Sequence, residues 1–310
     1  MKKKIKLFFV YLKRKSFFFM LKRKIGLTDK LSDAVYLRKF FYAALGYQLD
    51  LDNPVTFNQK MQWLKIYNKS PFFTDLVDKY KAKDIIKSII GEKYIVPTLG
   101  VWDSFDEIDF NLLPDKFVLK CTHDSGGLAI CKDKKTFNIK KARKKINKSL
   151  KAKFYLNGRE YQYKDVKPRI IAEQYLECDE GLRDYKFFNF SCVPKFLYIS
   201  EGLDNHSTAK ISFFDLNGKQ LPFKRSDYKA FDGDTVLPMN FEEMISINNK
   251  IAKYINNCFV RLDFYNVDGH IYFSEVTFFP NSGLIPFEPK EWDDELGSWI
   301  ILPRASDLRQ

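Results

Sequence analysis

The sequence predicts an α+β fold, in which helices and antiparallel hairpins mix without a regular strand–helix–strand alternation. The first part of the chain repeats apolar residues at helical spacing behind recognisable helix starts. The second part contains two hairpin patterns. At 310 residues, 45% apolar and 16% aromatic, the chain can build a large core and has room for one to three domains.

The positive charge is concentrated at the N-terminus. The chain carries 52 Lys+Arg and 39 Asp+Glu, a net charge of +13. Residues 1–24 hold ten of the basic residues and none of the acidic ones, which leaves 42 basic and 39 acidic residues, a net of +3, for the other 286. A nucleic-acid-binding domain should carry an excess of basic residues on one face. Because the chain after residue 24 is nearly neutral, we expect no nucleic-acid partner.

The N-terminal arm, residues 1–24, alternates cationic and aromatic blocks. Its apolar runs, 7–12 and 17–21, are far shorter than the ~20 residues that span a bilayer. Lys13-Arg14-Lys15 interrupts any signal-peptide pattern. Cations and aromatic rings are typical of contact with anionic headgroups, although the apolar residues fall all round a helical wheel. We predict contact with an anionic membrane surface; the alternatives are a helix docked on the body or a disordered basic tail.

Helices are predicted for the next part of the chain. Thr56 and Gln59 fit a capping box, and Phe57, Met61 and Leu64 follow at helical spacing. Ser70-Pro71 opens a second helix that we expect to run to about residue 88, with proline at its first position.

Strands and two further helices are predicted after residue 92. Single strands are expected at 94–97, 116–122, 128–131 and 169–176, and helices at 134–153 and 241–256. One hairpin is expected to pair 184–191 with 195–200 about residues 192–194, and another to pair 259–265 with 271–278 about Asp268-Gly269.

Two stretches suggest nucleotide binding. Lys120 leaves an apolar strand just before the glycine-rich turn 124–127, whose backbone N–H groups could hold phosphate oxygens. An ordinary hairpin turn with an exposed lysine is the alternative. The strand end 173–176 could offer backbone groups to an adenine, or could be an ordinary strand end.

A third stretch suggests a metal site. Asp263 and Glu275 fall on adjacent strands of one predicted hairpin and can project from the same face, onto which Arg261 also alternates. Two close carboxylates repel, and Mg²⁺ resolves that repulsion while keeping positions open for phosphates. An exposed hairpin with solvated charges is the alternative.

The order of these three stretches resembles the ATP-grasp superfamily, and most of all its TupA-like (teichuronopeptide) polysaccharide-biosynthesis branch. The resemblance covers roughly residues 50–300. It is carried by residues 53–65 (NPVTFNQKMQWLK), 78–80 (DKY), 96–97 (VP), 99–102 (LGVW), 120–127 (KCTHDSGG), 184–186 (DYK) and 260–263 (VRLD).

The resemblance implies two α+β subdomains that grip ATP. We therefore expect the arm at 1–24, a helical N-terminal region at 25–92, a subdomain with the glycine-rich loop at 93–175, and a C-terminal subdomain with the metal site at 176–310.

Site residues are implied position by position. The resemblance matches Lys79 and Lys120 to lysines that contact ATP phosphates, and Arg261 to an arginine that steadies the transferred phosphate and the acyl intermediate. Thr277 stands where the family commonly has a metal-binding Asn. The remaining matches are the phosphate-covering loop Ser125, Gly126 and Gly127, the adenine hinge Glu173, Gln174, Tyr175 and Leu176, a further nucleotide contact at Lys186, and the Mg²⁺ ligands Asp263 and Glu275.

His123 lies beside the glycine loop. It could contact phosphate or the acceptor during catalysis, or it could make a structural hydrogen bond, and the sequence leaves both open.

The implied function is an ADP-forming carboxylate–amine ligase that uses ATP and Mg²⁺. It would join an amino acid to the uronic-acid carboxyl or amino sugar of a glycan or lipid-linked glycan precursor. A glycosyltransferase of capsule or O-antigen biosynthesis and an ATP-grasp sugar kinase are the alternatives. Five cysteines without metal-binding spacing favour reduced thiols and hence the bacterial cytoplasm. The arm would place the protein on the inner face of the membrane.

Overall fold

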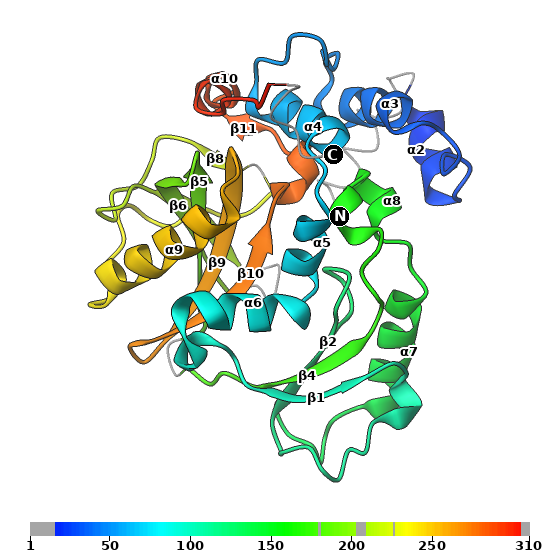
Figure 1. Ribbon diagram of the computed structural model, residues 1–310, viewed down its shortest axis with the longest axis vertical. Helices are drawn as coiled ribbons and strands as arrows, with labels where there is room; N and C mark the ends of the chain where they lie inside the picture. Colours follow the sequence, from blue (N-terminus) through cyan, green and yellow to red (C-terminus); the bar gives the residue numbers. More distant parts are fainter. Residues whose placement is uncertain (1–15, 179–180, 203–208, 226, 305–310) are drawn as a thin grey trace.

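The protein is described by a computed structural model that covers residues 16–178, 181–202, 209–225 and 227–304. Helices and three antiparallel sheets, one of them with only two strands, alternate irregularly along the described residues (Figure 1), which confirms the predicted α+β class. Across these residues, no helix combines the length and the apolar character that crossing a membrane requires.

The N-terminal helices include the predicted capping box. Thr56 Oγ1 accepts the Gln59 N–H at 3.1 Å, and Gln59 Oε1 accepts the Thr56 N–H at 3.3 Å. The helices are α2 Phe17–Lys24, α3 Asp33–Leu45, α4 Phe57–Tyr67, α5 Pro71–Val77 and α6 Lys81–Ile90.

The prediction of one helix from Pro71 to about residue 88 is wrong, because the chain breaks between α5 and α6. Buried Asp78 causes the break: its Oδ1 accepts the N–H groups of Tyr80 at 2.9 Å and Lys81 at 3.3 Å. A carboxylate that accepts these orphan N–H groups starts a new helix. The break places Lys79 outside both helices.

The first sheet has four antiparallel strands in the order β1-β4-β2-β3. The strand predicted at 94–97 is wrong. Residues 92–94 form a 3₁₀ turn and the strand starts after Pro97, which has no N–H to donate. The strands are β1 Thr98–Trp102, β2 Phe117–Cys121, β3 Leu128–Cys131 and β4 Ile170–Gln174.

The basic helix α7, Ile139–Leu150, packs on this first sheet through Ala142 and Ile146. It starts five residues later than the predicted 134–153 helix. Asn138 determines the start, since its side chain accepts the Lys141 N–H at 2.9 Å.

The second sheet has five antiparallel strands in the order β10-β9-β5-β6-β7, with α9 (Phe241–Ile255) packed against it. The predicted turn at Asp268-Gly269 is confirmed, with φ of 50° and 82°. The other turn lies at Ser191-Cys192, with φ of 47° and 67°, and not at 192–194. The strands are β5 Arg183–Phe190, β6 Val193–Glu201, β7 Lys210–Phe214, β9 Phe259–Val267 and β10 His270–Thr277.

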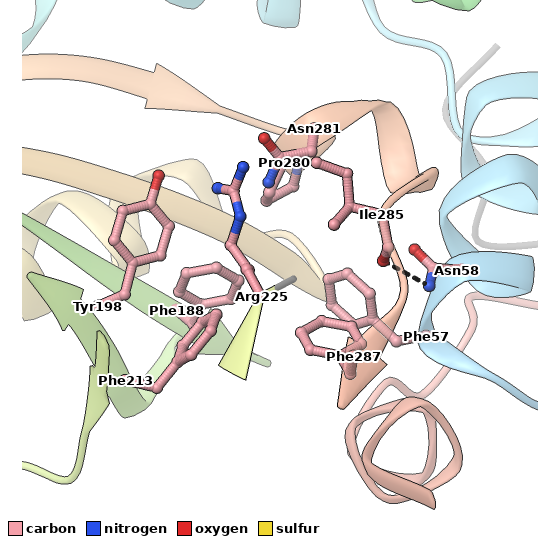
Figure 2. Close-up of a pocket in the computed structure, with 10 residues that line it drawn as sticks. All are labelled: Phe57, Asn58, Phe188, Tyr198, Phe213, Arg225, Pro280, Asn281, Ile285 and Phe287. Carbon is pink, nitrogen blue, oxygen red and sulfur yellow. Dashed lines mark hydrogen bonds between the residues drawn. The ribbon is translucent and has the colours of Figure 1, made fainter. Parts of the chain in front are cut away.

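The largest hydrophobic cluster joins α4, α5 and α6 to the second sheet. Phe57 of α4 meets Phe259 at 5.2 Å and Phe287 at 5.8 Å between ring centroids, and Figure 2 shows it beside Phe287. The remaining short elements are η2 Phe105–Glu107, α8 Tyr155–Gly158, η3 Tyr161–Tyr163, β8 Lys224–Arg225, η4 Pro280–Gly283, β11 Phe287–Glu288 and α10 Glu291–Ser298.

Residues 1–15 of the predicted arm lie outside the described residues. The rest of the arm forms α2, which docks on α3: Arg23 Nε donates to the Tyr36 hydroxyl at 2.7 Å, and the Arg23 guanidinium lies 4.2 Å from the centroid of the Phe40 ring. Phe18 and Leu21 of α2 remain 69% and 49% exposed. The docked helix therefore accounts for residues 17–24, and membrane contact stays a prediction.

Replacing Phe57 with alanine should lower the free energy of unfolding by about 3–5 kcal/mol, because it leaves a cavity between α4 and the second sheet. Denaturant unfolding measures this loss. Phe18→Ala, at an exposed ring, is the control and should change the value by less than about 0.5 kcal/mol. Equal losses for the two variants would contradict the packing described.

Candidate nucleotide and metal site

A hollow of about 210 Å³ lies between the two sheets and the break after α5. It brings together most of the predicted phosphate and metal residues, although they come from distant parts of the chain. Its walls are formed by Lys79, Lys120, Cys121, Asp124, Ser125, Gly127, Leu128, Glu173, Asp184, Lys186, Tyr265, Ser274 and Glu275.

Asp124 fixes the glycine-rich loop. Its Oδ1 accepts the Gly127 N–H at 2.9 Å, its Oδ2 accepts the hydroxyl of Ser149 on α7, and its backbone carbonyl accepts Lys79 Nζ. The Lys79 N–H also donates to the Thr122 carbonyl at 3.2 Å. The predicted phosphate lysine and the predicted phosphate loop are thus held together.

The loop requires glycine at one position. A Cβ on Gly127 would lie 2.5 Å from both Cys121 Sγ and Ser149 Oγ, so a side chain would push the loop off α7. Ser125 and Gly126 are exposed at the outer edge. Their exposure leaves this edge accessible to a ligand, while Gly127 anchors the inner one.

Glu173 on β4 joins two lysines. Its carboxylate lies 2.5 Å from Lys120 Nζ and 2.5 Å from Lys83 Nζ, and the residue is only 5% exposed. Burial raises the pKa of Glu173, but Lys120 and Lys83 outweigh burial and lower it to about 2. Sequence reasoning missed Lys83, because its partner Glu173 comes 90 residues later and no local pattern links the two.

The rest of the predicted adenine hinge follows directly. Gln174 is exposed and donates its N–H to the Pro97 carbonyl at 3.0 Å, while Tyr175 and Leu176 are half-buried beyond the end of β4. These residues lead from the first sheet toward the second. Their adenine-binding role stays a prediction.

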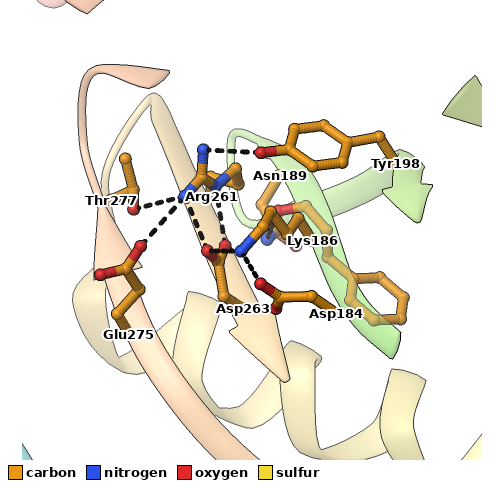
Figure 3. A network of polar contacts seen from close by, with 9 residues as sticks. Asp184, Lys186, Asn189, Tyr198, Arg261, Asp263, Glu275 and Thr277 are labelled. Atoms are coloured by element: carbon orange, nitrogen blue, oxygen red, sulfur yellow. Dashed lines mark hydrogen bonds and ion pairs between the residues drawn. The ribbon is translucent and has the colours of Figure 1, made fainter. Parts of the chain in front are cut away.

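Asp263 lies at the centre of a buried network of ion pairs, shown in Figure 3. Arg261 donates to both its oxygens, from Nε at 2.7 Å and from Nη2 at 2.6 Å, and Lys186 Nζ lies 2.6 Å away. Glu275 stands directly opposite Asp263 in the β9–β10 register and lies 3.3 Å from Arg261 Nη2. The predicted sharing of one face by these residues is confirmed.

The network sets the charge of its carboxylates. Burial raises the pKa of Asp263, but Arg261 and then Lys186 reverse this effect, so that the pKa falls and the carboxylate stays ionised. Burial raises the pKa of Asp184 to about 6, although Lys186 lies 2.5 Å away. The sequence signal for Asp184 was its position two residues before Lys186, on the same strand face.

The donors in this network suit magnesium. Asp263, Glu275 and Thr277 offer only oxygen, and all three contact Arg261 Nη2, Thr277 Oγ1 at 3.0 Å. Nowhere in the described part of the chain do three or more His, Cys, Asp or Glu residues gather as a metal site. Mg²⁺ commonly takes one or two protein carboxylates and completes its shell with phosphates and water, so a two-carboxylate site fits.

His123 does not reach the walls of the hollow. It is buried, and its Nε2 lies 3.1 Å from the Ser149 carbonyl oxygen. This contact matches the structural alternative, while a catalytic role for His123 stays a prediction.

Two antiparallel sheets facing a hollow lined by lysines, carboxylates and a glycine loop define an ATP-grasp type of nucleotide-binding protein. The TupA-like ATP-grasp family pattern matches residues 59–301, and the chain belongs to this family. Among curated proteins, no sequence matches the chain.

Solved structures with a similar fold include two ligases. D-Alanine–D-alanine ligase from Helicobacter pylori is 16% identical, with a TM-score of 0.47, over 79% of this chain and 69% of that one. L-Amino acid ligase from Bacillus licheniformis is 15% identical, with a TM-score of 0.44, over 73% of this chain and 49% of that one. The present chain thus spans about half the length of the second ligase.

Glu173→Gln should lower the free energy of unfolding at neutral pH by roughly 3 kcal/mol, because the carboxylate pKa falls from 4.5 to about 2 on folding. A lowered pKa stabilises the fold above pH 4.5, and this stabilisation is lost as the pH falls toward 2. The difference from the wild type should therefore narrow below pH 4.5, as measured by urea unfolding at several pH values.

The matched control for this experiment is Glu177→Gln, which breaks the exposed ion pair with Lys116. It should change stability by less than about 1 kcal/mol at any pH. A Glu173→Gln variant whose deficit stays constant down to pH 3 would contradict the role given to the ion pairs.

Proposed function

We propose that this protein is an ATP-dependent carboxylate–amine ligase that releases ADP and phosphate. The observation that carries the proposal is the pairing of Asp263 with Glu275 beside the lysine-lined hollow. Phosphoryl transfer needs neutralised charge and positioning more than covalent help, and these are what the hollow provides.

Each polar group has a part in the proposed reaction. Lys79 and Lys120 hold the phosphates under the Ser125–Gly127 edge, and Arg261 faces the charge that develops on the transferred group. A carboxylate oxygen of the substrate attacks the terminal phosphorus and ADP leaves. An amine nitrogen then attacks the acyl carbon, phosphate leaves, and the amine proton passes to water or phosphate. Mg²⁺ bound by Asp263 and Glu275 would neutralise phosphate charge.

The charges of the hollow also favour a metal-bound nucleotide. Its walls carry three lysines and four carboxylates, a net of −1. A free polyphosphate would be repelled, whereas a phosphate accompanied by a divalent cation would not. This balance supports the requirement for Mg²⁺.

The proposed substrates are an amino acid and a glycan or lipid-linked glycan precursor of capsular or other surface polysaccharide. The new amide would use a uronic-acid carboxyl or an amino sugar. The support for this choice is membership of the TupA-like branch. We place the enzyme in the bacterial cytoplasm, at the inner face of the membrane.

Asp263→Asn and Glu275→Gln should each lower ADP release by about a hundredfold or more, because each removes charge from the metal site. The assay uses Mg-ATP, candidate uronates and amino acids, with ADP measured by a coupled reaction. Glu242→Gln, an exposed glutamate on α9, is the control and should keep full activity.

Turnover that survives in both carboxylate variants would refute the ligase assignment. Phosphate retained on the sugar would instead support a sugar kinase, and sugar transfer from a nucleotide sugar without ATP would support a glycosyltransferase. Phosphorus NMR of the products separates the three outcomes.

The arm supplies a second prediction. Removing residues 1–24 should lower binding to vesicles containing phosphatidylglycerol, since it removes ten cations and the exposed Phe18 and Leu21. Phe18→Ser with Leu21→Ser keeps the α2 contacts of Arg23 and should weaken binding less. Co-sedimentation with phosphatidylcholine vesicles is the control, and equal binding of full-length and truncated protein to the anionic vesicles would contradict the prediction.

A further inference from the structure

A second hollow, of about 820 Å³, opens beside β7, β8 and β11 and lies apart from the nucleotide site. Four cations and two carboxylates line this second hollow, which gives its walls a net charge of +2. The walls of the nucleotide hollow have a net charge of −1. The walls of the second hollow are formed by Lys210, Lys224, Arg225, Tyr228, Lys229, Ala230, Phe231, Asp232 and Glu288.

Arg225 gives this second hollow a fixed anion-binding group. Its side chain is 8% exposed, and Asp227 accepts from its Nε at 3.0 Å and its Nη2 at 2.7 Å. The β8–β11 pairing, in which Arg225 stands opposite Phe287, sets its backbone. A guanidinium held in this way loses little freedom when it donates from Nη1 to a carboxylate or phosphate.

Tyr198 contacts both Arg225 and Arg261, the arginine of the proposed phosphoryl transfer. The guanidinium carbons of Arg225 and Arg261 lie 5.9 and 5.6 Å from the centroid of its ring, and Arg261 Nη1 lies 3.4 Å from its hydroxyl. Figure 2 shows Arg225 between Tyr198 and Asn281 of the turn that follows β10. A ligand held at Arg225 is therefore one aromatic ring away from the proposed phosphoryl-transfer site.

The aromatic side chains indicate what the uncharged part of the ligand is. Tyr228 and Phe231 line the same hollow as Lys224 and Lys229. Aromatic rings offer flat apolar faces, which suit the C–H face of a sugar ring, while the cations suit its charged substituent.

We infer that this second hollow binds the anionic sugar unit of the glycan substrate through Arg225, Lys224 and Lys229. This inference rests on the proposed function and names the substrate class for it: a sugar that carries a carboxylate or a phosphate. Four cations against two lining carboxylates and Asp227, which pairs with Arg225, leave a net charge of +1 that attracts such an anion before ATP binds.

The test measures sugar binding to the full-length protein by calorimetry, without ATP. The probes are glucuronate, glucose 1-phosphate and neutral glucose. The double variant Lys224→Ala/Lys229→Ala changes two exposed side chains of the hollow, so the fold should persist. The matched control is Lys195→Ala/Lys219→Ala, two exposed lysines outside the hollow.

We expect glucuronate, glucose 1-phosphate or both to bind the wild type, and glucose not to bind. The double variant should weaken binding of the anionic sugar by roughly tenfold or more, while its affinity for Mg-ATP stays unchanged. Preference for one anionic sugar over the other identifies the charged substituent.

Three results would overturn the inference: no binding of either anionic sugar, equal binding of glucose, or equal losses in the double variant and its control. Because the measurement needs no turnover, it separates this inference from the proposed ligase activity. Failure of both anionic sugars to bind the wild type, with its ADP release intact, rejects the second hollow alone. Retained turnover in Asp263→Asn and Glu275→Gln rejects the ligase alone.

Discussion

The buried charge of Asp263 is the constraint on which the rest of the site depends. A carboxylate that is 0% exposed costs several kcal/mol to desolvate unless cations and hydrogen bonds surround it. Arg261 comes from the same strand, but Lys186 comes from β5, which must pair with β9 in the register that sets Lys186 opposite Asp263. A shift of one residue would turn Lys186 to the other face and leave the charge with one partner fewer. The β5–β9 register that satisfies Asp263 therefore also positions Asp184, while the separate β9–β10 register places Glu275 opposite Asp263.

Glu173 imposes a similar condition on the first sheet. Its carboxylate holds Lys120 of β2 and Lys83 of α6, so a single charge joins a strand, its neighbour and a helix. Phosphate oxygens that approach Lys120 must compete with this ion pair. The ion pair keeps the Lys120 side chain ordered, so the proposed phosphate binding would exchange one anionic partner for another instead of ordering a free side chain.

Local patterns in the sequence predicted most of the hairpin site. Alternation on β9 and β10 and the turn at Asp268-Gly269 determine which residues face each other, so the pairing of Asp263 with Glu275 followed directly. The break at Asp78 and the partnership of Lys83 with Glu173 were missed. The break rests on bonds from the N–H groups of Tyr80 and Lys81 to the Asp78 carboxylate, which the apolar periodicity does not reveal. Lys83 and Glu173 are 90 residues apart in the sequence, and no local pattern links them. The second hollow was missed for the same reason, since β7, β8 and β11 meet only through the tertiary fold.

The charge balance of the two hollows supports our proposal of a different kind of anion for each. In the nucleotide hollow, three lysines face four carboxylates, so a polyphosphate gains little from entering unless it brings its own divalent cation. In the second hollow, four cations face two lining carboxylates and Asp227, so the remaining positive charge would favour an anion with a single charged group without any metal. The Tyr198 ring lies close to both sets of cations, with its centroid 5.6 Å from the Arg261 guanidinium carbon and 5.9 Å from that of Arg225. In the proposed reaction, a nucleotide with its metal would therefore lie close to the anionic sugar while each meets its own set of cations.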